Sequence, residues 1–460
     1  MTTTRLIFQL GTNNWQRQGE FAPGSGILHE AHHQAYAAMP GTASWSIYPS
    51  QVQTSPADEP EVRVFELDHP IPICESVSPV SSYRFHSMSD DDFTAYVARL
   101  ERFAEETIDA AEAAAGIPVT MAVAHHSFLN PLVLSSINRR RVEAGQPRFR
   151  LLCFVHGTAL KMFAHEKAGV DPEYPARFLP FMEQAGVFEP GGEVDLCAAI
   201  SGEQLEKFAD SFPRYPRDRM VLSPNGYAST IFRPDPGATA ERARILGELA
   251  PIGGGDSPAE HAPTAVDPDT DYVIVFTGKF ADWKRLDALL RAAAVYEQSE
   301  RLGRVTTLII GSGPDEAIAH HHRLAHDELG LRRTHFLGPQ PQPEIARLNA
   351  LADLGVYPSR NEPFGLVFIE AMACGTPVIG ADSGGPRDFV TDAVGGLVPE
   401  AEGTPFVTSL VTSIGEALAE DWKATKGPAA AAYAAANFST DKQCADLVTA
   451  LEAVDRQPAV

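Results

Sequence analysis

The chain has 460 residues, a net charge of −23 at pH 7, 44% hydrophobic residues and 21% charged residues. This length exceeds one ordinary core, so two or three domains are expected, and the composition is that of a water-soluble globular protein. The strong negative charge argues against nucleic acid as a partner. No apolar run approaches the ~20 residues of a membrane helix, so no stable membrane insertion is expected.

The five cysteines lie far apart and form no Cys-x-x-Cys pair. This pattern favours reduced thiols over a disulfide framework or a metal site, and therefore a cytoplasmic location. The first apolar run, Leu6–Leu10, is too short for a signal-peptide core and predicts the first strand of a buried sheet. A homo-oligomer is compatible with these features.

Short apolar runs alternate with amphipathic stretches in both halves of the chain, which predicts βαβ units and parallel sheets. The strands expected in the first half are Leu6–Leu10, Val119–Ala124, Leu151–Val155 and Leu196–Ile200. A helix is expected at Asp91–Ala115, and irregular or β-rich structure at Ala43–Ser89. Pro, Asn and Gly residues just after position 222 end the first domain, 1–222.

The second domain, 223–436, is expected to be doubly wound, with ligands at the carboxyl ends of its strands. Its predicted strands are Tyr272–Thr277, Thr306–Gly311, Thr334–Leu337, Gly355–Tyr357 and Thr376–Gly380. Its predicted helices are Arg285–Glu297, Asp315–Leu329, Gln342–Ala352 and Phe364–Ala373. The last segment, 437–460, is expected to return as a helix to the first domain.

The stretch that follows the strand at Tyr357 carries the main candidate site. A polar loop, Pro358–Pro363, leads into a helix expected to begin near Phe364. The first amides of a helix have no internal partners and carry the positive end of its dipole, so they are a natural seat for a diphosphate. Glu362 precedes this helix, and Glu370 lies about two turns further on, where its carboxylate can bind a ribose diol.

This stretch resembles the E-x7-E motif of the retaining GT-B glycosyltransferases of family GT4, also called glycosyl transferases group 1. Pro-Phe-Gly follows the first glutamate, and Gly-Thr-Pro-Val-Ile closes the segment. The resemblance covers about residues 221–400. It implies an α/β GT-B fold, with two Rossmann-like doubly wound domains facing each other across a cleft. It assigns Glu362 to the donor sugar and Glu370 to the ribose.

The resemblance implies further donor contacts in the second domain. They include the backbone of Phe364, Gly365, Leu366 and Val367, and the strand-end glycines Gly278 and Gly311. Lys279 and Lys284 are expected to neutralise the leaving diphosphate, and a solvated pair of lysines is the alternative. Lys279 stands where the family usually has arginine, so bidentate phosphate contact is lost at that position.

In the first domain, Pro23-Gly24-Ser25-Gly26 resembles the family's glycine loop after the first strand, which implies that Gly24 and Gly26 approach the donor. A plain turn is the alternative for this segment. His126 best matches the family histidine near the transferred sugar, and His125 is its rival. His156 ends another strand and is a candidate for the acceptor or sugar side.

The resemblance implies a hexosyl-type transfer that retains anomeric configuration and needs no metal or other cofactor. Asp269-Thr270-Asp271 precedes a strand and is expected to be a solvated loop rather than a metal motif. The partners are a nucleotide-diphosphate-sugar, with UDP or GDP left open, and a small soluble acceptor in natural-product or antibiotic biosynthesis. One such reaction is S-glycosylation of ergothioneine by a GDP-octose. The alternative is a GT-B nucleotide-sugar epimerase or hydrolase that uses water.

Overall fold

The computed structural model describes residues 3–15, 24–74, 83–169, 175–184, 186–252, 265–300, 302–362 and 364–455. Pro23, Pro363 and residues 456–460, on which sequence predictions were made, lie outside this description. In the described residues, no helix is long and apolar enough to cross a membrane.

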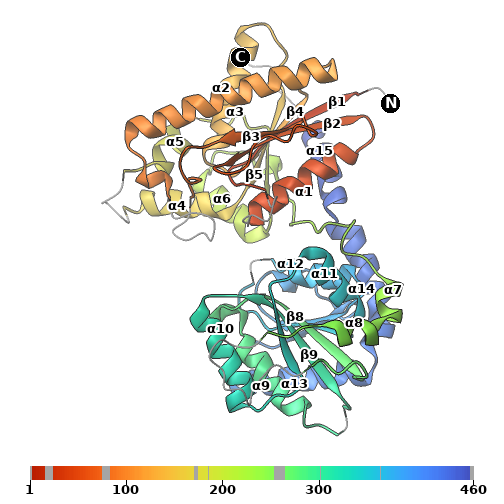
Figure 1. Ribbon diagram of the computed structural model, residues 1–460. Coiled ribbons are helices and arrows are strands. Elements are labelled where there is room, and N and C mark those ends of the chain that lie inside the picture. The colour runs from red at the N-terminus through yellow and green to blue at the C-terminus, as the bar shows by residue number, and fades with distance from the viewer. Residues whose placement is uncertain are drawn as a thin grey trace. The chain divides into compact units, whose positions relative to one another are not determined.

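The chain divides into two compact units (Figure 1). The N-terminal unit comprises Met1–Asn225 and Thr440–Val460, and the C-terminal unit comprises Gly226–Ser439. The last helix, α15 (Thr440–Ala453), therefore belongs to the N-terminal unit, where it packs along α1 (Gly24–Ala38).

The N-terminal unit is built on a parallel sheet with the strand order β3-β2-β1-β4-β5-β6-β7. Its strands are β1 (Arg5–Leu10), β2 (Thr42–Ser50), β3 (Val62–Glu66), β4 (Met121–His125), β5 (Arg150–Val155), β6 (Leu196–Ala199) and β7 (Met220–Leu222). Its other α-helices are α2 (Asp90–Ala115), α3 (Leu129–Glu143), α4 (Gly157–Lys167), α5 (Phe178–Gln184) and α6 (Gly202–Ser211). Strand β2 and strand β3 fill part of the region for which the sequence predicted irregular or β-rich structure.

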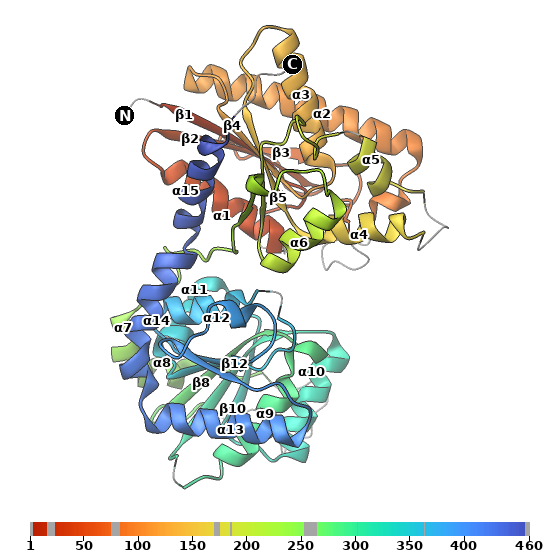
Figure 2. The same cartoon turned by 180° about the vertical axis from the view of Figure 1, so that it is seen from behind.

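Alternate residues of each strand face opposite sides of this sheet, as period-2 geometry requires. Ile7 and Val123 pack with α1 and α15 on one face, whereas Phe8 and Ala124 pack with α2 and α3 on the other. The two helical layers are visible from both sides of the molecule (Figures 1 and 2). Because both faces are covered, β4, β5 and β6 read as nearly continuous apolar runs.

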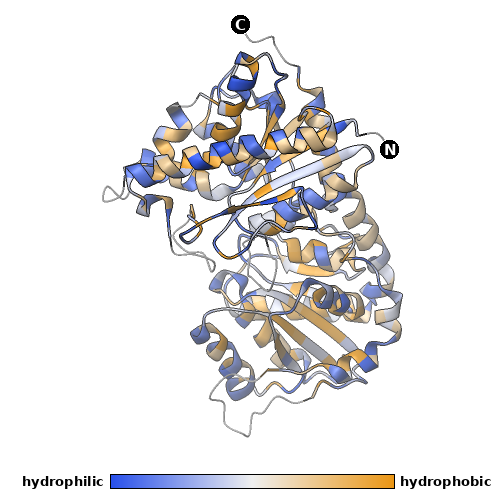
Figure 3. Ribbon diagram, turned by 45° about the horizontal axis from the view of Figure 1, so that its top comes forward, coloured by the Kyte–Doolittle hydropathy of each residue, from blue (hydrophilic) through white to orange (hydrophobic). Residues whose placement is uncertain are grey.

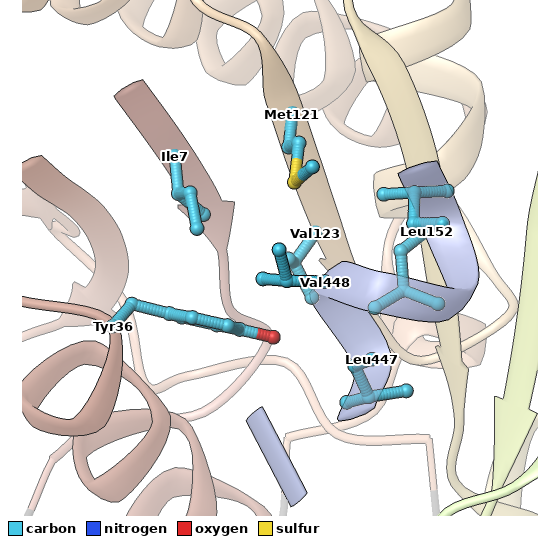
Figure 4. Close-up of a pocket in the computed structure, with 8 residues that line it drawn as sticks. Ile7, Tyr36, Met121, Val123, Leu152, Leu447 and Val448 are labelled. Atoms are coloured by element: carbon cyan, nitrogen blue, oxygen red, sulfur yellow. The ribbon is translucent and has the colours of Figure 1, made fainter. Parts of the chain in front are cut away.

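A small apolar pocket lies between the sheet, α1 and α15 (Figure 4). It is lined by Ile7, Tyr36, Met121, Val123, Leu152, Leu447, Val448 and Leu451. The Tyr36 side chain reaches across from α1, and a hydrogen bond joins it to Cys444 of α15. These contacts fasten the last helix to the unit.

The C-terminal unit repeats the same pattern, with the parallel strand order β10-β9-β8-β11-β12-β13. Its strands are β8 (Tyr272–Lys279), β9 (Val305–Ser312), β10 (Thr334–Gly338), β11 (Leu354–Tyr357), β12 (Val378–Ala381) and β13 (Gly395–Val398). Its α-helices are α7 (Pro236–Ala240), α8 (Arg242–Glu248), α9 (Leu286–Tyr296), α10 (Asp315–His322), α11 (Gln342–Leu351), α12 (Leu366–Ala373), α13 (Thr404–Ala419) and α14 (Trp422–Phe438). The strands form an apolar centre between more polar helices (Figure 3).

Two predicted helices differ in the structure. The single helix expected at Asp315–Leu329 is α10 followed by a π-helical segment, Arg323–Glu328. The helix expected to begin near Phe364 begins at Leu366. Gly365 has a φ of 101°, which no right-handed helix accepts, so the helix can start only after it.

Candidate functional site

The strand order of the C-terminal unit reverses between β8 and β11. The chain leaves β8 toward β9 and β10 on one side, and β11 leads to β12 and β13 on the other. In doubly wound sheets, ligands bind outside the carboxyl ends of the two strands where the order reverses. Lys279 is the last residue of β8, and Glu362 lies in the loop after β11, so both are at this switch point.

Lys284 and Glu362 form a direct ion pair at this position. Lys284 lies in a 3-10 turn, Asp282–Lys284, and its Nζ donates to Glu362 Oε2 at 2.7 Å. Both residues are buried, with 8% and 6% of their surfaces exposed. The same Nζ lies 4.2 Å from the centre of the Trp283 ring, whose face offers a second favourable contact for a cation. The structure thus brings two predicted catalytic residues together.

A turn at Ser383-Gly384-Gly385 fixes the backbone of Glu362. Gly385 N donates to Glu362 O at 2.7 Å. Ser383 Oγ accepts from the backbone N–H of Asn361 and donates to Asn361 Oδ1. A Cβ on Gly384 would lie 2.4 Å from Glu362 O, so only glycine permits this approach. This turn therefore positions Glu362.

Strained backbone flanks the candidate catalytic residues. Among the described residues, four non-glycine residues have positive φ: His126 at 75°, Arg285 at 52°, Asn361 at 48° and Asp421 at 48°. Arg285 directly follows Lys284, and Asn361 directly precedes Glu362. Such conformations cost of order 1–3 kcal/mol each and cluster where surrounding structure enforces a precise geometry.

The first amides of α12 lie beside Glu362. Gly365 caps the helix, and its carbonyl accepts a hydrogen bond from Phe368 N at 3.0 Å. The amides of Leu366 and Val367 come before Phe368, in the part of the helix where amides have no partner within the helix. A Cβ on Gly365 would lie 2.9 Å from the Phe368 ring and 3.4 Å from Glu362 Cγ. The Phe364 side chain faces the core, with its ring 5.7 Å from that of Phe389. Any donor contact of Phe364 must therefore come from its backbone.

Glu370 lies on α12, in surroundings that disfavour its charge. Burial raises the pKa of this carboxyl from 4.5 to about 8. Tyr357 at the end of β11 is a near neighbour, since the Glu370 charge contributes to raising the pKa of the Tyr357 hydroxyl. A ribose diol that donates two hydrogen bonds would favour the carboxylate form of Glu370.

The remaining predicted donor residues lie at the ends of β8 and β9. Gly278 and Gly311 are partners in the strand register, and a Cβ on Gly311 would lie 1.8 Å from Gly278 O. Gly311 has a φ of 143°. Glycine is thus needed here because the two backbones approach closely. Lys279 is exposed at the end of β8.

The N-terminal unit has an equivalent switch point between β1 and β4. Asn130 ties the two strand ends together, because its amide donates to Leu10 O at 2.9 Å and to His125 O at 2.8 Å. His125 ends β4, and His126 follows it in the left-handed region. His156 follows β5, and its ring centre lies 4.3 Å from that of His126. The three predicted histidines are therefore neighbours.

Two further histidines of this group come from α1 and were not singled out from the sequence. The His29 ring centre lies 4.4 Å from that of His125, and the His32 ring centre lies 5.5 Å from it. A Cβ on Gly11, just after β1, would lie 2.3 Å from His29 Nδ1, so glycine makes room for this ring. Their i, i+3 spacing places both residues on one face of the helix but does not by itself indicate a site. His29, His32, His125, His126 and His156 are called the histidine cluster below.

The predicted glycine loop is part of a helix instead. Gly24, Ser25 and Gly26 form the first residues of α1, and Asn13 donates to Ser25 Oγ at 2.7 Å. Gly24 is exposed, whereas Gly26 is buried. The expectation of a loop before the helix was wrong for these three residues, because the helix begins at Gly24.

The fold formed by the two units is that of the GT-B glycosyltransferases. Sucrose-phosphate synthase from Thermosynechococcus elongatus matches with a TM-score of 0.59 and 21% identity, over 98% of this chain and all of that chain. HepE of Anabaena, solved in complex with UDP and glucose, matches with a TM-score of 0.60 and 18% identity, over 97% of this chain and 99% of that one. These similarities confirm the predicted fold class.

Residues 259–426 match the family model of the glycosyl transferases group 1, which confirms the resemblance read from the motifs. D-inositol 3-phosphate glycosyltransferase of Mycolicibacterium gilvum is 38% identical over 192 residues, 41% of each chain. The enzyme of that name from Kribbella flavida is 34% identical over 250 residues, 53% of this chain and 52% of its own. The chain therefore spans about half, or less, of the length of these relatives.

Proposed function

We propose that the protein is a retaining, metal-independent glycosyltransferase that uses a nucleotide-diphosphate-sugar. One observation carries this proposal: the buried Lys284–Glu362 pair lies at the sheet's switch point, next to the first amides of α12. Its support comes from the family match over residues 259–426, which includes all of these groups. The activity rests on this segment because the relatives match only part of the chain.

In the proposed reaction, negative charge builds up on the diphosphate as the bond from C1 of the sugar breaks. The amides of Leu366 and Val367 and the ammonium groups of Lys284 and Lys279 stabilise this charge. Once Lys284 turns to the diphosphate, Glu362 Oε2 is free to hold the sugar and to favour positive charge near C1. Glu370 binds the ribose. The acceptor attacks C1 from the face that the diphosphate leaves and gives its proton to the departing phosphate oxygen, so the anomeric configuration is retained.

The proposed partners are a UDP- or GDP-linked sugar and a small soluble acceptor, without a metal ion. HepE, a structural neighbour, was solved with UDP and glucose, which makes UDP-glucose a reasonable first probe. His126 is proposed to orient the transferred sugar or the acceptor, with His125 and His156 on the same side. A narrower form of the proposal is S-glycosylation of ergothioneine by a GDP-octose in the cytoplasm, as part of natural-product biosynthesis.

Thermal-shift screening against UDP, GDP, ADP and dTDP tests the donor site first. A ligand that binds only the folded state raises its melting temperature by mass action, so the correct nucleotide stands out. Product analysis then follows with the matching sugar nucleotide, with and without acceptors. Sugar release to water alone, or epimerisation of the donor, would favour the alternative of a GT-B hydrolase or epimerase. A protein that binds none of the nucleotides would contradict the proposal.

A further inference from the structure

Trp283 is a large aromatic residue that lies at the protein surface beside a buried ammonium group. It is 40% exposed, whereas its neighbour Lys284 is 8% exposed. Both residues belong to the 3-10 turn Asp282–Lys284 that follows β8, and Lys284 Nζ lies 4.2 Å from the centre of the Trp283 ring. A ring with this exposure contributes little to a core, so its contact with Lys284 is the feature that needs an explanation.

The backbone of this turn is held without help from the indole ring. The Trp283 carbonyl accepts from Arg360 N at 2.7 Å. Arg285 follows the turn with a φ of 52°, and its Nη1 donates to Glu400 Oε1 at 2.9 Å. The Arg285 guanidinium also lies 3.8 Å from the centre of the Phe406 ring. The turn therefore keeps its place when the side chain of Trp283 is changed, and the ring has another role.

The ammonium group of Lys284 has two contacts of different kinds. It donates to Glu362 Oε2 at 2.7 Å, and it lies within cation–π distance of the Trp283 ring. In the proposed reaction the ammonium leaves Glu362 for the diphosphate, and its flexible four-carbon stem gives it many alternative positions. The ring is uncharged and attracts the ammonium through its face, so it leaves the N–H groups available to phosphate oxygens. The ring contact can thus persist while the ammonium changes partner.

We propose that Trp283 is a positioning residue for Lys284, whose ring guides the ammonium from Glu362 to the leaving diphosphate and holds it there. This rests on the proposed function, because it assigns a part in that reaction to a further residue. Trp283 acts through Lys284 and needs no contact with the donor. An ammonium that is already confined loses less freedom as charge develops on the diphosphate, so the ring raises kcat and the affinity for the departing nucleotide diphosphate.

Steady-state kinetics of Trp283→Leu and Trp283→Phe test this role. Phenylalanine keeps a smaller aromatic face, and leucine keeps an apolar side chain without one. Trp283→Leu is expected to lower kcat by about fivefold to tenfold and to leave KM for the sugar nucleotide within about twofold. Trp283→Phe should fall between the leucine variant and the wild type. Equal kcat values for the wild type and both variants would overturn the proposal.

Trp422 provides the matched control, because Lys426 Nζ lies 3.4 Å from the centre of its ring. This second contact between a lysine and a tryptophan involves none of the residues of the switch point. Trp422→Leu should leave kcat of the folded protein unchanged, and Trp422→Phe replaces it if the leucine variant folds poorly. An equal fall in kcat for the Trp422 and Trp283 variants would overturn the proposal, because the effect would then be one of general stability.

Nucleotide binding in a double-variant cycle shows whether the ring acts through Lys284. UDP and GDP are titrated into the wild type, Trp283→Leu, Lys284→Ala and the double variant. For the nucleotide that binds more tightly, Trp283→Leu is expected to weaken binding by about fivefold, and by less than about twofold when Lys284 is already alanine. Equal losses in both backgrounds would overturn the proposal, because the ring would then act on the nucleotide directly or through the fold.

The wild type by itself separates the two possible failures. A wild type that binds UDP or GDP and transfers a sugar, together with Trp283 variants that match it, would refute the role of Trp283 and leave the proposed function standing. A wild type that binds neither nucleotide and transfers no sugar would refute the proposed function, and the role of Trp283 would fall with it.

Discussion

Lys284 Nζ lies 2.7 Å from Glu362 Oε2, and both groups are almost fully buried at the switch point of the C-terminal sheet. The proposed reaction needs these two charges on different partners: the ammonium on the diphosphate and the carboxylate on the sugar. The pair keeps both charges balanced and in place. Donor binding then exchanges one ion pair for two new contacts, without bringing a bare charge into a buried site.

The first prediction concerns the stability of this pair. Lys284→Met should lower the free energy of unfolding by about 3 kcal/mol, because it leaves the Glu362 carboxylate buried without a counter-charge. The double variant Lys284→Met, Glu362→Gln should recover much of that loss. Denaturant unfolding of the single and double variants measures both effects. Lys207→Ala, which breaks the exposed Lys207–Glu203 pair, is the control and should change stability by less than about 1 kcal/mol. Equal, small losses for all variants would contradict a buried pair.

The second prediction separates the kinetic roles of Lys284 and Glu370. Lys284→Ala should lower kcat far more than it changes KM, because its ammonium acts on charge that develops in the transition state. Glu370→Ala should mainly raise KM for the donor, because the ribose is held equally in both states. Steady-state kinetics with a saturating acceptor provide the comparison. The same losses in both parameters for both variants would count against these assignments.

The third prediction follows from the raised pKa of Glu370, about 8 against an ordinary 4.5. Between these values the folded protein holds a proton that the unfolded chain has released, so this group lowers stability as the pH rises from 4.5 to 8. Glu370→Gln should remove this contribution and gain stability relative to the wild type above pH 8. Donor affinity of the wild type should rise over the same range, because the carboxylate is the form that accepts from ribose. Melting curves and nucleotide titrations across pH test both statements, and identical pH profiles for wild type and variant would contradict them.

The fourth prediction concerns Gly365. Alanine there must adopt a φ of 101° and place its Cβ 2.9 Å from the Phe368 ring. Gly365→Ala should therefore lower stability by about 1–2 kcal/mol and shift the first turn of α12, with weaker nucleotide binding as the result. Gly202→Ala at the start of α6 is the control, because its Cβ would meet nothing within 4 Å. A Gly365→Ala variant that matches this control in both measurements would show that the helix start is not constrained as described.

The fifth prediction concerns acid. Burial lowers the pKa of His32 and His126 to about 4, below the 6.5 of the unfolded chain. Each then contributes of order 3 kcal/mol that is fully present above pH 6.5 and is lost as the pH falls toward 4. Unfolding monitored through Trp15, which contacts the cluster, should show this loss. His32→Phe should flatten the profile, and an unchanged slope would contradict the burial of a neutral ring.

Much of the fold could be read from the sequence, because most of these fully covered parallel strands are short apolar runs. The same apolar runs located the two loops of the switch point. Lys284 comes shortly after the run that forms β8, and Glu362 comes shortly after the run that forms β11. Helix starts were less predictable. Apolar residues continue from Phe364 into α12, so nothing in the pattern reveals that Gly365 has a left-handed backbone and delays the helix by two residues.

The histidine cluster was found only in part for a different reason. His125, His126 and His156 follow strands, and strand ends point to a site, but His29 and His32 lie on a helix face that could equally be ordinary core. Their contact with His125 depends on α1 packing beside the carboxyl end of β1, where Gly11 admits the His29 ring. Such long-range contacts follow from tertiary packing rather than from local spacing.

The most direct measurement of the central claim is a crystal structure of the protein with its preferred nucleotide diphosphate. The account predicts that phosphate oxygens accept hydrogen bonds from the amides of Leu366 and Val367, and that Lys284 Nζ has moved from Glu362 to the diphosphate. A nucleotide bound elsewhere, or a diphosphate that leaves the Lys284–Glu362 pair intact and the α12 amides uncontacted, would contradict it.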